Sequence, residues 1–201
     1  MAQRNQRPTN VAYYRRNRQR EIERVRSRQD ATRDHLRALR AVPCHDCGRA
    51  FAPYQMDFDH RSPAQKSFRL TAGSGMLASS ERLEAELRKC DVVCANCHRV
   101  RTQRRQAASL AGRRLGQPSA ELQRKRRYWR AQARMLAGLK ERPCADCDER
   151  FPACAMDFDH RYPRTKRFTV SKMIGRAGTA RIMAEVAKCD IVCANCHRDR
   201  T

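Results

Sequence analysis

The chain has 201 residues, enough for one ordinary domain or two small ones, and its 40% hydrophobic content is lean for a single large core. Its 44 lysines and arginines against 21 acidic residues give a net charge of +23, which favours a polyanionic partner such as nucleic acid. No run of about 18 apolar residues is present, which excludes a membrane span, and the start lacks the apolar stretch of a signal peptide. We therefore expect a cytoplasmic protein without a membrane partner.

Most of the positive charge lies in two segments, each of which precedes a group of cysteines. Residues 1–42 hold 12 basic and 4 acidic side chains, and residues 99–142 hold 14 and 2. Residues 43–98 are neutral, and residues 143–201 carry only +3. We therefore expect basic arms beside nearly neutral modules. The predicted division is a basic helical arm (1–42), a first module (43–111), a basic helical linker (112–142) and a second module (143–201).

Both basic segments are predicted to be mainly helical. No proline interrupts the chain between Val11 and Val42 or between Ser119 and Arg142, and Arg, Gln, Glu, Ala and Leu dominate both stretches. Their apolar faces are weak, so a solvated charged helix or a disordered basic tail is the alternative, above all for residues 1–12. Arginine outnumbers lysine 37 to 7, which suits bidentate phosphate contacts and equally fits a GC-rich coding sequence. The predicted nucleic-acid contacts are Arg124, Lys125, Arg126 and Arg127.

The chain contains a tandem repeat with a period of about 100 residues. A proline followed by a C-x2-C pair, an MDFDHR segment and a KCD-[VI]-VCANCHR segment all occur twice. The matching segments are 43–47 and 143–147, 56–61 and 156–161, and 89–99 and 188–198. Each module has about 55 residues, a size at which a domain without a metal is marginal.

The repeated cysteine pairs predict one structural zinc site in each module. Two C-x2-C pairs can direct four sulfur atoms at one tetrahedral ion, and with no export signal a reduced metal site is favoured over a disulfide scaffold. The predicted zinc ligands are Cys44, Cys47, Cys94 and Cys97 in the first copy and Cys144, Cys147, Cys193 and Cys196 in the second.

Three further cysteines are not predicted to be ligands. Cys90 and Cys189 end predicted short helices at 80–89 and 179–188, where their spacing from the preceding apolar residues indicates buried thiols. Cys154 has no counterpart in the first copy and is interpreted in the same way. A redox or metal sensor that uses these thiols is a third hypothesis, which nothing in the sequence favours.

The segment between the cysteine pairs contains residues that a structural zinc module does not need. Phosphodiester hydrolysis needs a divalent ion to polarise the phosphate and a base to activate water. A carboxylate and an imidazole can hold such an ion, and a second imidazole can take the proton. The sequence offers this set twice, as Asp59, His60 and His98 and as Asp159, His160 and His197.

These residues resemble the motif of the HNH nucleases, also called His-Me finger or ββα-metal nucleases, in their zinc-knuckle branch. The pattern is C-x2-C, then Asp-His-x-x-Pro, then C-x2-C-His, and it covers about 110 of the 201 residues. The resemblance implies an α+β fold of two small zinc-stabilised ββα-metal modules, each preceded by a basic arm. By analogy, His60 and His160 are the general bases. The implied ligands of a catalytic Mg²⁺ or Mn²⁺ ion are Asp59, His98, Asp159 and His197.

The sequence departs from the family at one position. An asparagine that braces the loop between the strands is absent from residues 61–93 and 161–192. Asp91 and Asp190 are the nearest polar substitutes. Asp57 and Asp157 share a strand face with the predicted metal ligands by the two-residue period, either supporting them or simply facing solvent.

The sequence is therefore compatible with two functions. The first is a metal-dependent endonuclease whose two modules act on DNA, or on RNA, as a covalent pseudo-dimer that needs no further subunit. The second is a non-catalytic, zinc-stabilised nucleic-acid-binding protein. Retention of all three chemical residues in both copies favours the enzyme.

Overall fold

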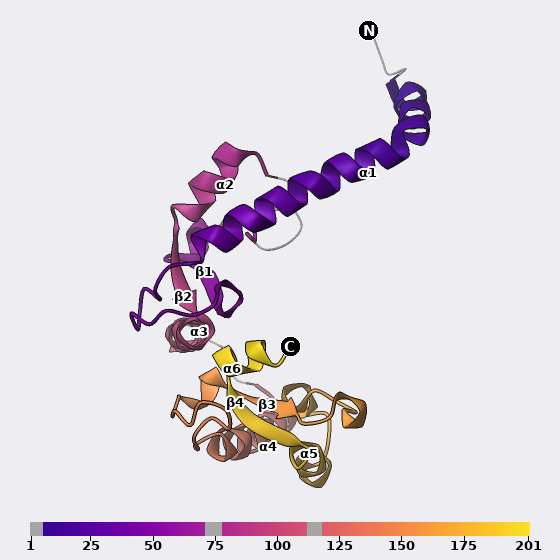
Figure 1. Ribbon diagram of the computed structural model, residues 1–201. Coiled ribbons are helices and arrows are strands. Elements are labelled where there is room, and N and C mark those ends of the chain that lie inside the picture. Colours follow the sequence, from indigo (N-terminus) through magenta and orange to yellow (C-terminus); the bar gives the residue numbers. More distant parts are fainter. Residues whose placement is uncertain (1–5, 71–77, 112–117) are drawn as a thin grey trace. The chain divides into compact units, whose positions relative to one another are not determined.

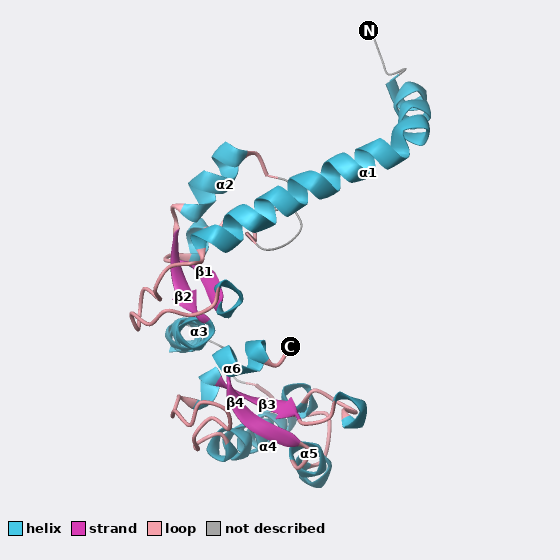
Figure 2. Ribbon diagram, viewed as in Figure 1, coloured by secondary structure: helices cyan, strands magenta, loops and turns pink. Residues whose placement is uncertain are grey.

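The structure is a computed structural model that describes residues 6–70, 78–111 and 118–201 (Figure 1). It consists of helices and two small two-stranded sheets, which confirms the expected α+β class (Figure 2). The elements of the first copy are α1 (Gln6–Leu39), β1 (Met56–His60), α2 (Ser80–Leu87), β2 (Cys90–Cys94) and α3 (Ala95–Ala111). Those of the second copy are α4 (Ala120–Leu139), β3 (Met156–His160), α5 (Thr179–Val186), β4 (Cys189–Cys193) and α6 (Ala194–Asp199).

The repeated sequence thus folds into the same order of elements twice. Both basic segments form helices, as predicted, and α1 begins at Gln6, while residues 1–5 lie outside the described part. The predicted short helices at 80–89 and 179–188 are also confirmed, each ending two residues early because the following lysine and cysteine lead into a strand. None of the helices in the described ranges combines the length and apolar character needed to cross a membrane.

The chain divides into two compact units, each described here by itself. One comprises Met1–Pro43, Ala50–Tyr54 and Phe58–Val92, and the other comprises Cys44–Arg49, Gln55–Asp57 and Val93–Thr201. The second unit therefore holds both cysteine pairs of the first copy together with all described residues of the second copy.

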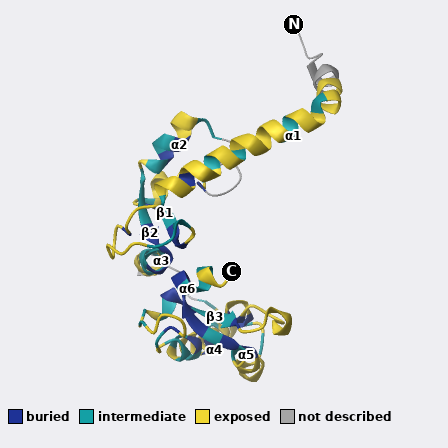
Figure 3. Ribbon diagram, in the orientation of Figure 1, coloured by how far each residue is buried: buried dark blue, intermediate teal, exposed yellow. Residues whose placement is uncertain are grey.

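The first unit has a small core at the C-terminal end of α1. Leu36 packs with Leu70 and Leu83, and Phe58 and Phe68 lie against this cluster. The rest of α1 is mostly exposed, as expected from its weak apolar face (Figure 3). The described part of α1 thus joins the core near its C-terminal end, around Leu36.

In the second unit, α4 is a structural part of the module and not only a linker. Leu136 belongs to the core formed with Val170, Met173, Ile182 and Cys189. The buried Gln132 of α4 donates a hydrogen bond to the Ala177 carbonyl and accepts one from the Gly175 N–H, both at 2.9 Å. Gly175 has φ +74°, and a Cβ there would lie 2.5 Å from the Trp129 ring, so only glycine fits. The C-terminal half of α4 is therefore fixed to the loop before α5.

Strand pairing sets the two faces of the second module. β3 pairs with β4 in antiparallel register, with Met156 opposite Cys193 and His160 opposite Cys189. Because side chains alternate along a strand, Met156, Phe158 and His160 share one face, and Asp157 and Asp159 share the other. Met156 and Phe158 pack into the core. The two acids therefore lie on the face opposite His160.

Equivalent residues of the two copies meet within the second unit. The backbone N–H of Asn96 donates to the Asn195 side-chain oxygen at 3.3 Å, and the N–H of Asn195 donates to that of Asn96 at 3.2 Å. Arg49 forms an ion pair with Glu149, the residue at the equivalent position of the second copy. Helices α3 and α6 lie side by side at this contact (Figure 1). Such self-complementary pairing is the geometry of a two-fold interface, here formed within one chain.

Candidate metal centres

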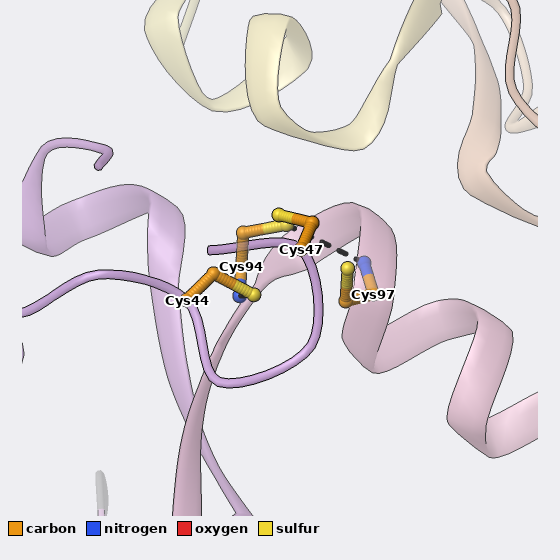
Figure 4. A group of neighbouring side chains, drawn as sticks. All are labelled: Cys44, Cys47, Cys94 and Cys97. Atoms are coloured by element: carbon orange, nitrogen blue, oxygen red, sulfur yellow. Dashed lines mark hydrogen bonds between the residues drawn. The ribbon is translucent and has the colours of Figure 1, made fainter. Parts of the chain in front are cut away.

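Four cysteine side chains of the first copy converge on one point (Figure 4). Cys44 and Cys47 come from a turn, whereas Cys94 ends β2 and Cys97 lies in the first turn of α3. The four sulfur atoms all lie within 4.8 Å of one another. This donor set is that of a structural zinc site, so the two distant C-x2-C pairs do meet as predicted.

One thiol of this group is placed to carry negative charge, whereas the pKa values of Cys94 and Cys97 are raised. Burial raises the pKa of Cys44, but hydrogen bonds from the backbone N–H groups of Cys47, Cys94 and Asp46 outweigh it and bring the pKa to about 7. The Cys94 N–H donates to the Cys44 sulfur at 3.2 Å. Burial and then repulsion from Cys94 raise the pKa of Cys97. Four thiolates can share this volume only around a cation, and a zinc ion would supply it.

The second copy repeats this arrangement. Its four sulfur atoms also lie within 4.8 Å of one another, and the Cys193 N–H donates to the Cys144 sulfur at 3.1 Å. The Cys193 sulfur accepts from the Cys196 N–H at 3.4 Å, so a predicted zinc ligand also caps α6. The ligand set is Cys144, Cys147, Cys193 and Cys196.

An acidic face with a histidine lies directly beside the second four-cysteine group. His197 follows Cys196 on α6, and its Nδ1 lies 2.8 Å from an Asp157 carboxylate oxygen. Its Nε2 lies 3.5 Å from Asp159. The hydrogen bond to Asp157 raises the pKa of His197 and fixes the proton on Nδ1, which leaves Nε2 facing Asp159. Asp157 therefore supports the histidine and is not simply a solvated strand acid.

Asp159 and His197 provide two ligand atoms for a second cation, not a complete set. Within the described residues, only the two four-cysteine groups bring three or more such atoms within 4.8 Å. The other Asp159 oxygen accepts a hydrogen bond from Arg200 at 3.1 Å, and Arg200 also holds Asp146 and Asp190. An ion at this position would therefore need further ligands from phosphate and water.

His160 lies on the opposite face of β3, away from the acidic pair. It is 9% exposed, and its Nε2 lies 2.8 Å from the carboxylate of Glu185 on α5. Burial raises the pKa of Glu185, but contacts from Lys188, the Arg167 N–H and His160 lower it to about 2. Because the carboxylate is ionised and can only accept, His160 Nε2 carries a proton.

Sequence reasoning did not identify this buried glutamate. Glu86 and Glu185 stand at equivalent positions and are only 1% and 3% exposed. Both lie three residues before a lysine that contacts them, at 2.6 and 2.7 Å. A charged residue at the same place in both copies, on the apolar side of a short helix, was the available signal.

In the first copy the corresponding residues belong to two compact units. Within the first unit, His60 contacts Glu86 at 2.8 Å, and Asp59 is buried. Within the second unit, His98 Nδ1 lies 2.9 Å from Asp57. A groove of about 440 Å³ in the second unit is lined by Asp57, His98, Arg99 and Arg198, among others.

In each copy an arginine connects the two strands. Arg161 Nη1 donates to the Cys189 carbonyl at 2.9 Å and contacts Asp190 at 3.2 Å. Arg61 makes the equivalent contacts to the Cys90 carbonyl and Asp91, both at 3.0 Å. The arginine directly after each Asp-His pair therefore ties the end of one strand to the start of the next.

The three other cysteines and the predicted nucleic-acid contacts complete the set of predicted residues. Burial raises the pKa of Cys90 and of Cys189 to about 11, and both thiols donate to carbonyls of the preceding helix. Cys189 is buried, as predicted, whereas Cys90 and Cys154 are only half-buried. The basic cluster predicted to bind nucleic acid lies on α4, where Arg124, Lys125 and Arg127 are exposed and Arg126 is half-buried.

Comparison with family models, curated proteins and solved structures gives no match to this chain. The resemblance to HNH nucleases therefore rests on the sequence motif.

Replacing Glu185 with Gln should lower the free energy of unfolding by about 3–5 kcal/mol, because removal of one member of a buried charge pair leaves the other uncompensated. The same change at exposed Glu121, which pairs with Lys125, should cost less than about 1 kcal/mol. Urea unfolding followed by circular dichroism measures both.

The effect of Glu185 should also depend on pH. Its pKa is about 2 in the folded protein against an ordinary 4.5, so its contribution is complete above pH 4.5 and is lost as the pH falls towards 2. The difference between wild type and Glu185→Gln should therefore narrow over this interval. Equal costs for the two glutamates, or a difference that widens in acid, would contradict this description.

Proposed function

We propose that this chain is a metal-dependent endonuclease of the HNH type that hydrolyses phosphodiester bonds in DNA. The observation that carries the proposal is the pair of Asp159 and His197, 3.5 Å apart beside a four-cysteine group, with His197 oriented by Asp157. A metal-binding histidine commonly donates its other ring N–H to a carboxylate, as His197 does. A zinc structural site alone needs none of these three residues.

The two kinds of metal site would have separate tasks. Zinc in the four-cysteine groups would hold the start of α6 and so fix the backbone next to His197. A divalent ion such as Mg²⁺ or Mn²⁺ at Asp159 and His197 would polarise the phosphate and stabilise the leaving oxygen. Arg200 would balance the Asp159 charge in the absence of the ion.

The general base in this proposal is His160, with His60 in the first copy. Since Nε2 carries the proton that Glu185 accepts, the neutral ring has its lone pair on Nδ1, and Nδ1 is the atom that would take a proton from water. The ionised Glu185 would then stabilise the resulting imidazolium, as a buried carboxylate does beside other catalytic histidines. Glu185 is a positioning residue in this scheme.

The basic helices would supply binding energy without sequence readout. Helix α4 presents Arg124, Lys125 and Arg127 to solvent, and most of the described α1 residues before Leu36 are exposed. Guanidinium groups on a helix suit phosphate contacts that depend on salt rather than base sequence. Two sites in one chain would allow both strands of a duplex, or two strands of a junction, to be cut.

Two observations favour the non-catalytic alternative. His160 lies on the face of β3 opposite Asp159, so the structure does not place the proposed base beside the proposed metal ligands. The contact of His160 with a buried carboxylate is also what a purely structural histidine would make. In that case the chain would be a zinc-stabilised nucleic-acid-binding protein, and the histidines would serve the fold.

The two functions differ in a nicking assay with supercoiled plasmid and Mg²⁺ or Mn²⁺. The wild type should nick, and the combination of His60→Ala with His160→Ala should reduce nicking by at least about 100-fold, in line with loss of a general base. Zinc content and retention on DNA should not change.

His35→Ala is the matched control, because His35 is an exposed histidine whose ring lies 3.0 Å from Glu84 and away from the proposed site residues. Equal nicking by the control and by the double variant would overturn the assignment of the base. No nicking by pure, zinc-loaded wild type would favour the binding protein.

The role of α4 can be tested by the salt dependence of DNA affinity. Replacing Arg124, Lys125, Arg126 and Arg127 with Gln should reduce the slope of log affinity against log salt by roughly 3 to 4, because each phosphate contact contributes about 0.9. A variant with Lys at the three arginine positions keeps the charge and should keep the slope. An unchanged slope in the Gln variant would mean that this part of α4 does not contact phosphate.

A further inference from the structure

Each histidine that follows a four-cysteine group is linked to an arginine of the other copy. Asp157 holds His197 with one carboxylate oxygen, and its other oxygen accepts from Arg99 Nη1 at 2.6 Å. In the reciprocal contact, a single oxygen of Asp57, Oδ2, lies 2.9 Å from His98 Nδ1 and accepts from Arg198 Nη2 at 2.7 Å. All six residues belong to the same compact unit.

The exchange is reciprocal because the two copies meet around a pseudo-two-fold axis. Asn96 and Asn195, which bond to each other, are only 5% and 3% exposed, so this part of the interface is closed to water. Arg99 and Arg198 lie three residues further along α3 and α6, one helical turn away on the same side. The helix geometry therefore directs each arginine across the interface towards the strand of the other copy.

The arginine has a defined effect on the aspartate that it contacts. Arg99 Nη1 and His197 Nδ1 contact different oxygens of the Asp157 carboxylate, at 2.6 and 2.8 Å. With one oxygen held by a guanidinium, the other is fixed in the direction of His197 Nδ1. A carboxylate held in this way orients the imidazole and sets its tautomer, which are the requirements for a metal ligand.

We propose that Arg99 is a positioning residue for the metal site of the second copy, and that Arg198 positions His98 through Asp57 in the same way. Each site is then complete only when the two copies are docked, and neither arginine touches the metal ion. This inference rests on the proposed function for the identity of the ion. The cross-copy orientation of the histidines is a separate property and can be observed without activity.

The competing role for these arginines is direct phosphate contact. Both line the groove of about 440 Å³ beside His98, and both side chains are partly exposed. If they bound phosphate in this groove, both arginines would act on the strand beside His98. As a positioning residue, Arg99 acts instead on the second copy, so its effect when one site is disabled distinguishes the two roles.

The test uses the full chain in two backgrounds, His60→Ala and His160→Ala, so that only one site is active in each. In the His60→Ala background the remaining site is that of the second copy, and Arg99→Gln should reduce its nicking by about 10- to 100-fold, several times more than Arg198→Gln does. In the His160→Ala background the order should reverse. Raising the Mn²⁺ concentration should restore part of the lost rate, because the defect is in metal binding.

Histidine side-chain NMR spectra give a readout that does not depend on cleavage. Arg99→Gln in the otherwise wild-type chain should change the ring nitrogen signals of His197 more than those of His98, and Arg198→Gln should do the reverse. Arg150→Gln, a change at an exposed arginine, is the matched control.

The outcomes separate the two proposals. If each arginine variant changes the NMR signals of the histidine in the other copy but the protein does not nick DNA, the positioning role stands and the nuclease proposal is overturned. Nicking losses that follow the arginine's own copy, or that are equal in both backgrounds, would overturn the positioning role and leave the nuclease in place.

Discussion

The structure depends on bringing together two cysteine pairs that lie 46 residues apart in the first copy and 45 in the second. Each group joins a turn before the first strand to the junction of the second strand and its helix. That junction carries both the asparagine at the interface of the copies and the histidine beside the acidic face. A metal ion in each group would therefore fix more than the module itself. The asparagine at the interface and the histidine beside the acidic face both lie in the first turns of the helix that carries the last cysteine ligand.

Charge is arranged differently in the two parts of each repeat. On the long helices, arginines mostly face solvent, where they repel one another and are available for an anion. Within the modules, charged groups satisfy one another, as in the Glu185, His160 and Lys188 cluster and the contacts of Arg200 with three aspartates. The surplus of +23 is thus concentrated on surfaces that the fold does not need for its own pairing, which is consistent with the proposed binding of nucleic acid.

The sequence was sufficient to predict features that depend on local pattern. Helical composition predicted α1 and α4, the repeated spacing predicted two four-cysteine groups, and the two-residue period placed Asp157 beside Asp159. It could not predict Glu185 as the partner of His160, because this contact depends on how α5 packs against β3. It also could not predict Arg99 at Asp157, since residues 58 positions apart meet only after the copies dock. The period of a strand or helix predicts the face on which a side chain lies, whereas tertiary packing determines which residue it contacts.

The central claim is that two closed, all-sulfur zinc sites organise this chain. X-ray absorption at the zinc edge, together with the metal content of the purified protein, tests it most directly. The account predicts two zinc ions per chain, each with four sulfur ligands at about 2.3 Å. One zinc ion per chain, or a nitrogen or oxygen ligand in the zinc shell, would contradict it, because His98 and His197 would then serve the structural ion and could not be ligands of a second one.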